Sequence, residues 1–350
     1  MKQQRVSVMR LAACVPSIPA VLVSSLEKCG IRTETDLLFS ASTFDIFRRL
    51  PAGTTTLREL KECTAVVGKL ASAPGRSAAD LIKALPAAEE EEFLSGVPSL
   101  DRLLHGLVST RRLIEVSGDR GSGKTSLVLH LVLRHLIHRP QSGILWIDTT
   151  GDFSAATATD ILEKHEELGA PTALDRLQVS LAFEVDAVYD VLQELKSSLT
   201  SGVAPEIRVR GIVVDTITAL LGPNLSPISS HGHAIMTGFM QQLRAFAQTF
   251  SLTIFVINNS AAYTPFVSGT ASNNPNIRKP ALGPSFTFLT DATLWLALRR
   301  DDSDAQGDGY TKHVAQVYRS KVTASKTLCS FRIQQGVVLA CGEEHSLCSD

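Results

Sequence analysis

The chain has 350 residues, of which 44% are hydrophobic and 20% charged, a composition typical of globular proteins with a buried core. Its 34 basic and 35 acidic side chains give a net charge of −1, which excludes nucleic-acid binding through overall positive charge and leaves only a local basic patch. No apolar run approaches the roughly 18–20 residues that cross a bilayer, so we expect no contact with a membrane.

The N-terminal part is predicted to be a small all-helical domain, residues 1–70. Residues 1–13 lack the apolar core of a signal peptide, and the six cysteines form no CxxC pair, so we expect an intracellular protein with reduced thiols. Helices are expected over 16–29, where Gly30 is placed to cap the end, from Thr33 or Thr35, and over 42–50, 57–70 and 77–85. Residues 71–93, rich in alanine, proline and glutamate, are predicted to be a linker that a short helix interrupts.

From residue 94 to 350 the pattern changes to short apolar runs that alternate with longer amphipathic stretches. Runs that are apolar throughout and separated by helices indicate a mostly parallel sheet with helices on both faces. The expected strands are 113–116, 144–147, 177–181, 212–214 and 253–257, and the expected helices are 124–138, 155–168, 186–200 and 234–250. Four further strands, 292–299, 313–318, 328–333 and 337–340, are expected to extend the sheet, in the antiparallel sense.

A phosphate-binding loop (P-loop) follows the first of these strands. Gly118-Asp-Arg-Gly-Ser-Gly-Lys124-Thr125 fits the pattern GxxxxGK[ST], with a strand before it and a helix after it. The glycines allow backbone N–H groups to surround a phosphate, and the helix N-terminus adds partial positive charge. Lys124 is placed to reach the β- and γ-phosphates, and Thr125 to bind Mg²⁺. The nucleotide-binding residues are predicted to be Gly118, Asp119, Arg120, Gly121, Ser122, Gly123, Lys124, Thr125 and Ser126.

An acidic residue ends the apolar run Gly-Ile-Val-Val-Asp215, as in the Walker B motif that holds Mg²⁺ through water. Asp148, which ends another run, is a rival for a place near the phosphates, and it could also be a helix cap. Both interpretations of Asp148 are open on the sequence alone.

These motifs, together with several others, resemble the RecA/RadA-type strand-exchange recombinases and their eukaryotic paralogues, the D-type paralogue most of all. The resemblance covers residues 94–340 and also the segment from Cys29 to Leu38 in the helical domain. The segments that carry it include 94–106 (LSGVPSLDRLLHG), 147–153 (IDTTGDF), 257–259 (INN), 279–283 (KPALG) and 292–296 (ATLWL). The resemblance implies a RecA-like core that binds ATP and Mg²⁺, nuclear location and a role in homologous recombination and DNA repair. It also implies a mediator complex with other recombinase paralogues, and single-stranded or branched DNA as a partner.

The chain departs from the active members of this family at positions that matter for hydrolysis. Thr150 stands where they carry the glutamate that orients the attacking water, and threonine cannot act as a carboxylate base. Asp152 is a candidate substitute. Asn259 takes the place of the glutamine that senses the γ-phosphate, and the linker has no Phe-x-x-Ala motif for filament assembly. The resemblance therefore implies weak or absent ATP hydrolysis.

Two loops are expected to face DNA by the same resemblance. The first, residues 222–233, has no lysine or arginine. The second, residues 260–279, offers Tyr263 and Phe266 for stacking and Arg278 and Lys279 for phosphate contacts. The alternative is a plain surface loop.

Three functions are consistent with these features. The first is an ATP-binding mediator subunit, the second is an active DNA-dependent ATPase that forms its own filament, and the third is a P-loop kinase for a small metabolite. The missing glutamate and linker motif oppose the second. The absence of an arginine-bearing lid in the sequence opposes the third.

Overall fold

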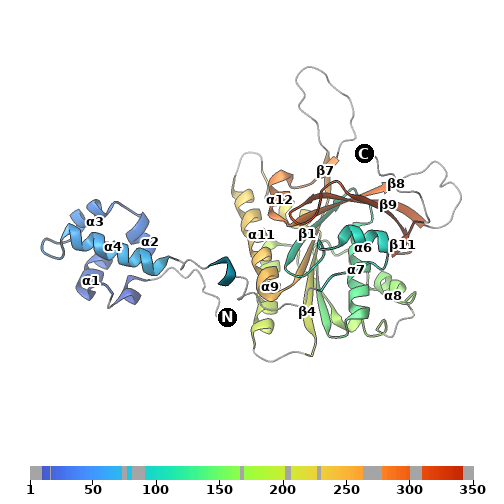
Figure 1. Ribbon diagram of the computed structural model, residues 1–350, viewed down its shortest axis with the longest axis horizontal. Coiled ribbons are helices and arrows are strands. Elements are labelled where there is room, and N and C mark those ends of the chain that lie inside the picture. Colours follow the sequence, from blue (N-terminus) through green and yellow to red (C-terminus); the bar gives the residue numbers. More distant parts are fainter. Residues whose placement is uncertain are drawn as a thin grey trace, which may run out of the picture. The chain divides into compact units, whose positions relative to one another are not determined.

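The computed structural model of the chain describes residues 10–15, 17–72, 77–80, 91–165, 169–201, 206–226, 230–262, 278–299 and 310–341. The chain divides into two compact units, Met1–Ala87 and Ala88–Asp350, which Figure 1 shows as blue helices and a larger α/β body. Within the described ranges, no helix has both the length and the apolar character needed to span a membrane.

The first unit is helical, as predicted. Its elements are a 3-10 turn at Leu11–Cys14 and the helices α1 (Ala20–Lys28), α2 (Glu34–Phe39), α3 (Thr43–Arg49) and α4 (Leu57–Ala71). Thr33 and Thr56 begin α2 and α4 with capping boxes, in which the threonine hydroxyl and an acidic side chain three residues later each accept a backbone N–H. The apolar faces of the helices meet in one small core. The expected helix over 77–85 lies largely outside the described residues.

The second unit contains a nine-stranded sheet in the order β11-β10-β9-β8-β1-β5-β4-β2-β3. The six strands from β8 to β3 run parallel, and β9, β10 and β11 extend the sheet in the antiparallel sense, as expected. The strands are β1 (Arg112–Gly118), β2 (Ser142–Asp148), β3 (Leu177–Leu181), β4 (Arg208–Asp215), β5 (Thr253–Asn258), β8 (Ala292–Arg299), β9 (Tyr310–Ser320), β10 (Leu328–Gln334) and β11 (Val337–Ala340).

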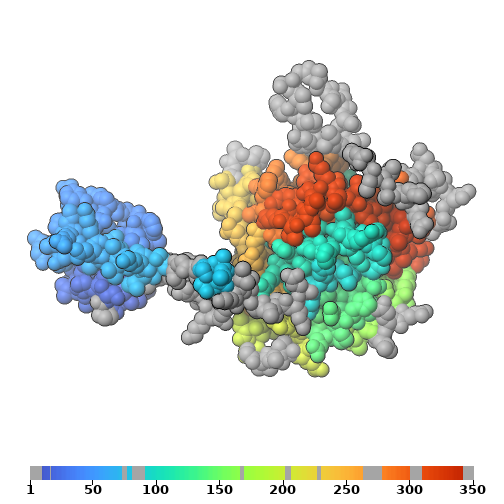
Figure 2. Space-filling view, viewed as in Figure 1, coloured from blue at the N-terminus to red at the C-terminus, as the bar shows by residue number. Residues whose placement is uncertain are grey.

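Helices cover both faces of the sheet because its central strands are apolar on both sides. In β1, Ile114 and Val116 point into one core and Leu113 into the other. The first core is closed by α6 (Pro98–Leu104), α7 (Lys124–His138) and α8 (Ala155–Leu162), and the second by α9 (Val185–Thr200), α10 (Ile217–Leu221) and α11 (His231–Phe250). Figure 2 shows α6, in turquoise, beside the red C-terminal strands, in agreement with its packing on β10.

Three helix boundaries differ by at least three residues from the sequence prediction, the first being the start of α1 at Ala20 and not at residue 16. Helix α8 ends at Leu162, not at residue 168, because the backbone N–H groups of Lys164 and His165 bond to carbonyls three residues earlier and tighten the chain into a turn. Helix α11 begins at His231, inside the segment 222–233 that was expected to be a loop. Gly232 lies so close to the Asn224 carbonyl that a side chain would not fit there.

The packing of the second unit begins at residues 91–93, which the sequence placed in the linker. Phe93 is 1% exposed, stacks on His135 with ring centroids 4.1 Å apart and meets Phe255 edge-on at 5.3 Å. Glu91 pairs with Arg210 of β4 at 3.2 Å. These contacts fix the start of the second unit against the sheet.

Candidate nucleotide-binding site

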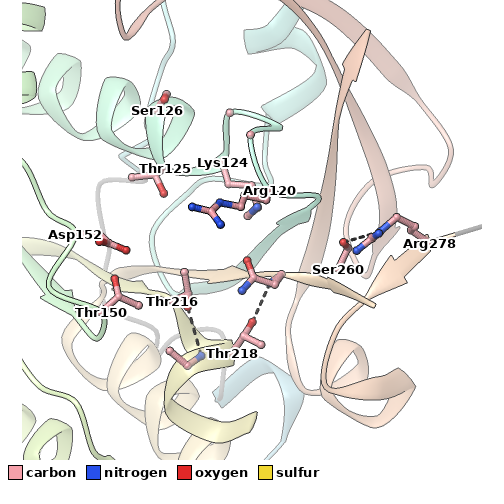
Figure 3. Close-up of a pocket in the computed structure, with 14 residues that line it drawn as sticks. Arg120, Lys124, Thr125, Ser126, Thr150, Asp152, Thr216, Thr218, Ser260 and Arg278 are labelled. Atoms are coloured by element: carbon pink, nitrogen blue, oxygen red, sulfur yellow. Dashed lines mark hydrogen bonds between the residues drawn. The ribbon is translucent and has the colours of Figure 1, made fainter. Parts of the chain in front are cut away.

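The carboxyl ends of the parallel strands β1, β2, β4 and β5 surround one cavity of about 770 Å³. Loops that follow parallel strands meet at this edge of a sheet, so residues far apart in the sequence converge there. The cavity is lined by Arg120, Gly121, Gly123, Lys124, Thr125, Ser126, Thr150, Asp152, Thr216, Thr218, Ala219, Asn259, Ser260 and Arg278 (Figure 3). It therefore gathers most of the residues predicted from the P-loop and all three predicted catalytic positions.

The P-loop occupies the turn between β1 and α7, as the sequence predicts. Gly118 is in contact with the backbone carbonyl of Leu296 in the neighbouring strand β8, so this position has no room for a side chain. Gly123 has a left-handed φ of 87°, which only glycine adopts at little cost, and it precedes the first residue of α7. The loop thus ends at the N-terminus of a helix of 15 residues, where partial positive charge attracts an anion.

The ammonium group of Lys124 lies over the loop. It donates hydrogen bonds to the carbonyls of Gly118, at 3.0 Å, and Asp119, at 2.8 Å, and the residue is 7% exposed. Burial lowers the pKa of Lys124, an effect that the carboxylates of Asp215 and Asp119 oppose. A buried ammonium group at a P-loop is suited to bind phosphate oxygens, because their negative charge compensates its positive charge.

Thr125 and Asp215 come together as the magnesium prediction requires. The Thr125 hydroxyl donates to Asp215 Oδ2 across 3.0 Å, from the start of α7 to the end of β4. Burial raises the pKa of Asp215 to about 6, the Thr125 hydrogen bond and Lys124 lower it, and Asp148 and Asp152 raise it. One hydroxyl and one carboxylate are the hard oxygen donors that a P-loop protein offers to Mg²⁺ beside the phosphates, so these residues fit the ion.

Asp148 organises a turn. Its Oδ1 accepts the N–H groups of Thr150, at 2.9 Å, and Gly151, at 2.8 Å, and its Oδ2 accepts that of Phe153 at 2.9 Å. Burial acts to raise the pKa of this carboxyl group, but the backbone hydrogen bonds outweigh it and hold the pKa below its usual range. The turn sets Thr150 and Asp152 on the cavity wall. It uses both carboxylate oxygens of Asp148, whereas Asp215 bonds to the Thr125 hydroxyl.

The side chain of Thr150 is tied to this turn, because its hydroxyl lies 3.3 Å from Asp148 Oδ1. It carries no carboxylate toward the cavity. Asp152, two residues on, is an acidic side chain of the same turn and lines the cavity with Thr150 (Figure 3).

Asn259 also lines the cavity, and both its backbone N–H and its carbonyl are hydrogen-bonded. Its N–H donates to the Thr218 hydroxyl at 2.8 Å, and its carbonyl accepts the N–H of Ala281 at 2.8 Å. The adjacent Asn258 is fully buried and bonds to Glu115 at 2.6 Å and to the Ala281 carbonyl at 3.0 Å. Burial raises the pKa of Glu115 to about 7, against the lowering effect of the bonds from Asn258 and Thr293.

The ends of the expected second loop form a short antiparallel pair, β6 (Ser260–Ala262) and β7 (Arg278–Pro280). Arg278, which the resemblance assigns to DNA phosphate, pairs with Asp119 of the P-loop, with Nε 2.6 Å from Oδ1, and it lines the cavity. Lys279 stands opposite Ala261 in the strand pair. Tyr263 and Phe266 lie outside the described residues.

Sequence reasoning missed four residues of the cavity wall: Thr216, Thr218, Ala219 and Ser260. Thr216 follows Asp215 directly, Thr218 and Ala219 come in the next turn of the chain, and Ser260 follows Asn259. The position of these residues in the sequence could have identified them. Residues that come just after a site residue at the end of a strand lie at the same edge of the sheet as that residue.

Comparisons with known proteins place this site in a family. The model of the Rad51 family matches residues 92–339. The "DNA repair protein RAD51 homolog 4" of Bos taurus is 28% identical over 292 residues, which cover 83% of this chain and 85% of that protein. Its counterpart from Mus musculus is 28% identical over 205 residues, or 58% and 59% of the two chains.

A solved structure shows the same fold. The crystal structure of the RadB recombinase superimposes with a TM-score of 0.55, at 22% identity, over 71% of this chain and the whole of that one. The second unit is therefore a RecA-like recombinase fold, with a largely parallel sheet between two layers of helices and a helical region before it. Because the family model extends over most of the sheet and every strand that borders the cavity, the chain belongs to the Rad51 family.

Proposed function

We propose that the chain binds ATP with Mg²⁺ and acts in homologous recombination and DNA repair as a subunit of a mediator complex, with weak or absent ATP hydrolysis. The observation that carries the proposal is the composition of the cavity. Its wall carries Lys124 and Thr125, which are suited to the phosphates of a nucleoside triphosphate and to its metal, and a threonine at the position where the resemblance predicts the hydrolytic glutamate.

The binding half of the proposal rests on Lys124, Thr125 and Asp215. Mg²⁺, when bound, neutralises the charge of the phosphates. Thr125 and Asp215, whose side chains are already 3.0 Å apart, are placed to hold the ion, and Lys124 is placed beside the phosphates. The pair would exchange its direct hydrogen bond for contacts to the ion or to its water.

The hydrolytic half rests on Thr150. A general base must accept a proton from the attacking water, and an alcohol has no capacity for this at neutral pH. The Thr150 hydroxyl also contributes to the Asp148 turn, so its place in the structure is explained without catalysis. We expect a nucleotide that stays bound and stabilises the surrounding segments, as γ-phosphate contacts do in other switch proteins.

Asp152 favours a second function, an active DNA-dependent ATPase that assembles its own filament. Its carboxylate lines the cavity two residues from Thr150, so it is the candidate base of that alternative. Thr150 bears on the first function and Asp152 on the second. Single substitutions at the two positions therefore distinguish the two functions.

The cellular part of the proposal is supported by relatives whose names describe them as DNA repair proteins. We propose other recombinase paralogues as partners in a hetero-oligomer, single-stranded or branched DNA as a ligand and the nucleus as location. Lys279 remains a candidate DNA contact, and Arg278 becomes one only if its pair with Asp119 opens.

The test is ATP binding and single-turnover hydrolysis by the full chain, with and without single-stranded DNA. We expect tight binding without turnover, loss of binding in Lys124→Ala, and turnover gained in Thr150→Glu but not in the shape-matched Thr150→Gln. Robust DNA-stimulated turnover by the native chain, abolished by Asp152→Asn, would establish the alternative instead. An increase in the molecular mass of the assembly on addition of ATP and DNA, measured by light scattering, would also support the filament-forming alternative.

A further inference from the structure

His313 lies behind the P-loop, on strand β9 of the antiparallel extension. It is 2% exposed, and its ring stacks on Phe331 of β10 with centroids 5.5 Å apart. Its Nδ1 is 3.0 Å from the backbone carbonyl of Ser122, and its Nε2 is 2.6 Å from the Thr311 hydroxyl. The ring is thus fixed by two hydrogen bonds and a stacking contact, and one of its partners is the P-loop itself.

The chemistry of the two partners determines which nitrogen carries the hydrogen. A carbonyl oxygen only accepts, so Nδ1 must donate to Ser122. In the neutral ring, Nε2 is then an acceptor. The Thr311 hydroxyl has the Ile333 carbonyl at 3.3 Å and Nε2 at 2.6 Å, and it donates to Nε2, the nearer acceptor. Burial lowers the pKa of His313, while its bond to Ser122 opposes that shift, and the neutral form with hydrogen on Nδ1 follows.

The contact with Ser122 has a consequence on the other side of the loop. A peptide group is planar and trans, so the Ser122 carbonyl and the Gly123 N–H point in opposite directions. With the carbonyl bonded to His313, the N–H of Gly123 is directed away from β9. Gly123 lines the nucleotide cavity and Ser122 does not, so this N–H is directed toward the side where phosphate is expected.

Gly123 also permits the approach of β9 and β10. A β-carbon at this position would lie 3.1 Å from the His313 ring and 2.6 Å from the Ile333 side chain. The antiparallel strands therefore form the floor beneath the last turn of the P-loop.

We propose that His313 is a positioning residue for nucleotide binding, which holds the Ser122–Gly123 peptide with its N–H toward the phosphate. This inference rests on the proposed function, because it concerns the same cavity. Without His313 the peptide is free to rotate, and the ligand must restore its orientation at the expense of affinity.

The two nitrogens of the ring can be replaced one at a time. Asparagine places an N–H one bond beyond Cγ, as histidine does with Nδ1, whereas glutamine places its amide farther out, near the position of Nε2. The matched control is His130, which is 1% exposed and has Nε2 2.9 Å from the Ser95 carbonyl, on the part of α7 away from the cavity.

The experiment is titration of the full chain with a fluorescent ATP analogue and Mg²⁺, beside thermal unfolding. We expect His313→Ala and His313→Gln to bind roughly tenfold more weakly, since a hydrogen bond that orders the site contributes about one such factor. His313→Asn should regain most of the affinity, to within about threefold of the native chain. His130→Ala should lose thermal stability but keep its affinity within about twofold.

Native-like affinity in His313→Ala, or rescue by glutamine and not by asparagine, would overturn the inference while leaving the proposed function in place. Failure of the native chain to bind would defeat the proposed function itself. In that case the ¹⁵N resonances of the histidine rings still test the hydrogen bond between His313 and Ser122. The spectrum of His313→Asn, which lacks the His313 signals, assigns them. A hydrogen on Nδ1 supports the contact with Ser122, and a neutral ring with hydrogen on Nε2 contradicts it.

Discussion

Arg278 and Asp119 form an ion pair that joins strand β7 to the P-loop, with Nε and Oδ1 2.6 Å apart. Ser260 of β6 bonds to both side chains, so the base of the β6–β7 pair is attached to the loop that surrounds the phosphate. A change in the P-loop therefore has a direct path to the segment that the resemblance assigns to DNA.

The energy of this pair should be small. The two side chains are 45% and 49% exposed, and solvent screens ion pairs of this kind. We expect a double-mutant cycle with Asp119→Ala and Arg278→Ala to give a coupling below about 1 kcal/mol that decreases with added salt. Urea denaturation measures it, and a coupling of several kcal/mol that is insensitive to salt would contradict this description.

Magnesium-dependent nucleotide binding should weaken at low pH because of Asp215. Its pKa of about 6 means that the carboxylate, the form that binds a cation, is lost as pH falls through 6. We expect ATP affinity in the presence of Mg²⁺ to rise between pH 5 and 7 in the native chain. Asp215→Asn should bind more weakly and with a smaller rise, the part that protonation of the ATP γ-phosphate itself produces, as calorimetric titration can show.

The same group affects stability with the opposite sign. A carboxyl group whose pKa is raised on folding binds its proton more tightly in the folded state, so the stability it contributes is present at low pH and lost as pH rises through about 6. Asp215→Asn should therefore stabilise the nucleotide-free protein at pH 7.5, by on the order of 2 kcal/mol. Loss of stability in this variant would show that the carboxylate is better accommodated than its burial indicates.

Asp148 should be essential to its turn. Asp148→Ala leaves the N–H groups of Thr150, Gly151 and Phe153 without their partner, and we expect a loss of about 2–4 kcal/mol in the free energy of unfolding. Asp148→Asn keeps one acceptor oxygen and should lose less. Since the pKa of this group is lowered on folding, its contribution is present above the ordinary carboxyl range and lost as pH falls through the lowered pKa.

Phe93 should be important for the stability of the second unit. Phe93→Ala removes a fully buried ring that contacts both His135 and Phe255, and we expect a loss of about 3–5 kcal/mol. Phe93→Leu should cost less, because it fills most of the volume. Stability of Phe93→Leu equal to that of the native chain would show that the ring contacts contribute little beyond volume.

Much of the fold could be predicted because its signals are local. The strand before Gly118, the helix from Lys124 and the apolar run ending at Asp215 each span at most 15 residues, and periodicity is enough to recognise them. The antiparallel extension was predicted for the same reason.

The remainder depends on contacts that no local pattern carries. Thr218 reaches the cavity only because β4 lies beside β5, and His313 meets Ser122 across 191 positions of the sequence. Asp148 and Asp215 look alike as strand-end acids. They are distinguished by the turn at 148–153, because its backbone N–H groups donate hydrogen bonds to the carboxylate of Asp148.

Because the oxygens of Asp148 accept backbone N–H groups of its turn, Asp148 does not join Asp215 as a second carboxylate ligand for a cation. Across the described ranges there is no cluster of three or more His, Cys, Asp or Glu side chains that could hold a metal ion. Mg²⁺ keeps most of its water and binds such sites through one or two carboxylates together with substrate phosphates. Under the proposed function, we therefore expect Mg²⁺ and the nucleotide to bind as one complex, so that chelating agents would release the nucleotide without unfolding the chain.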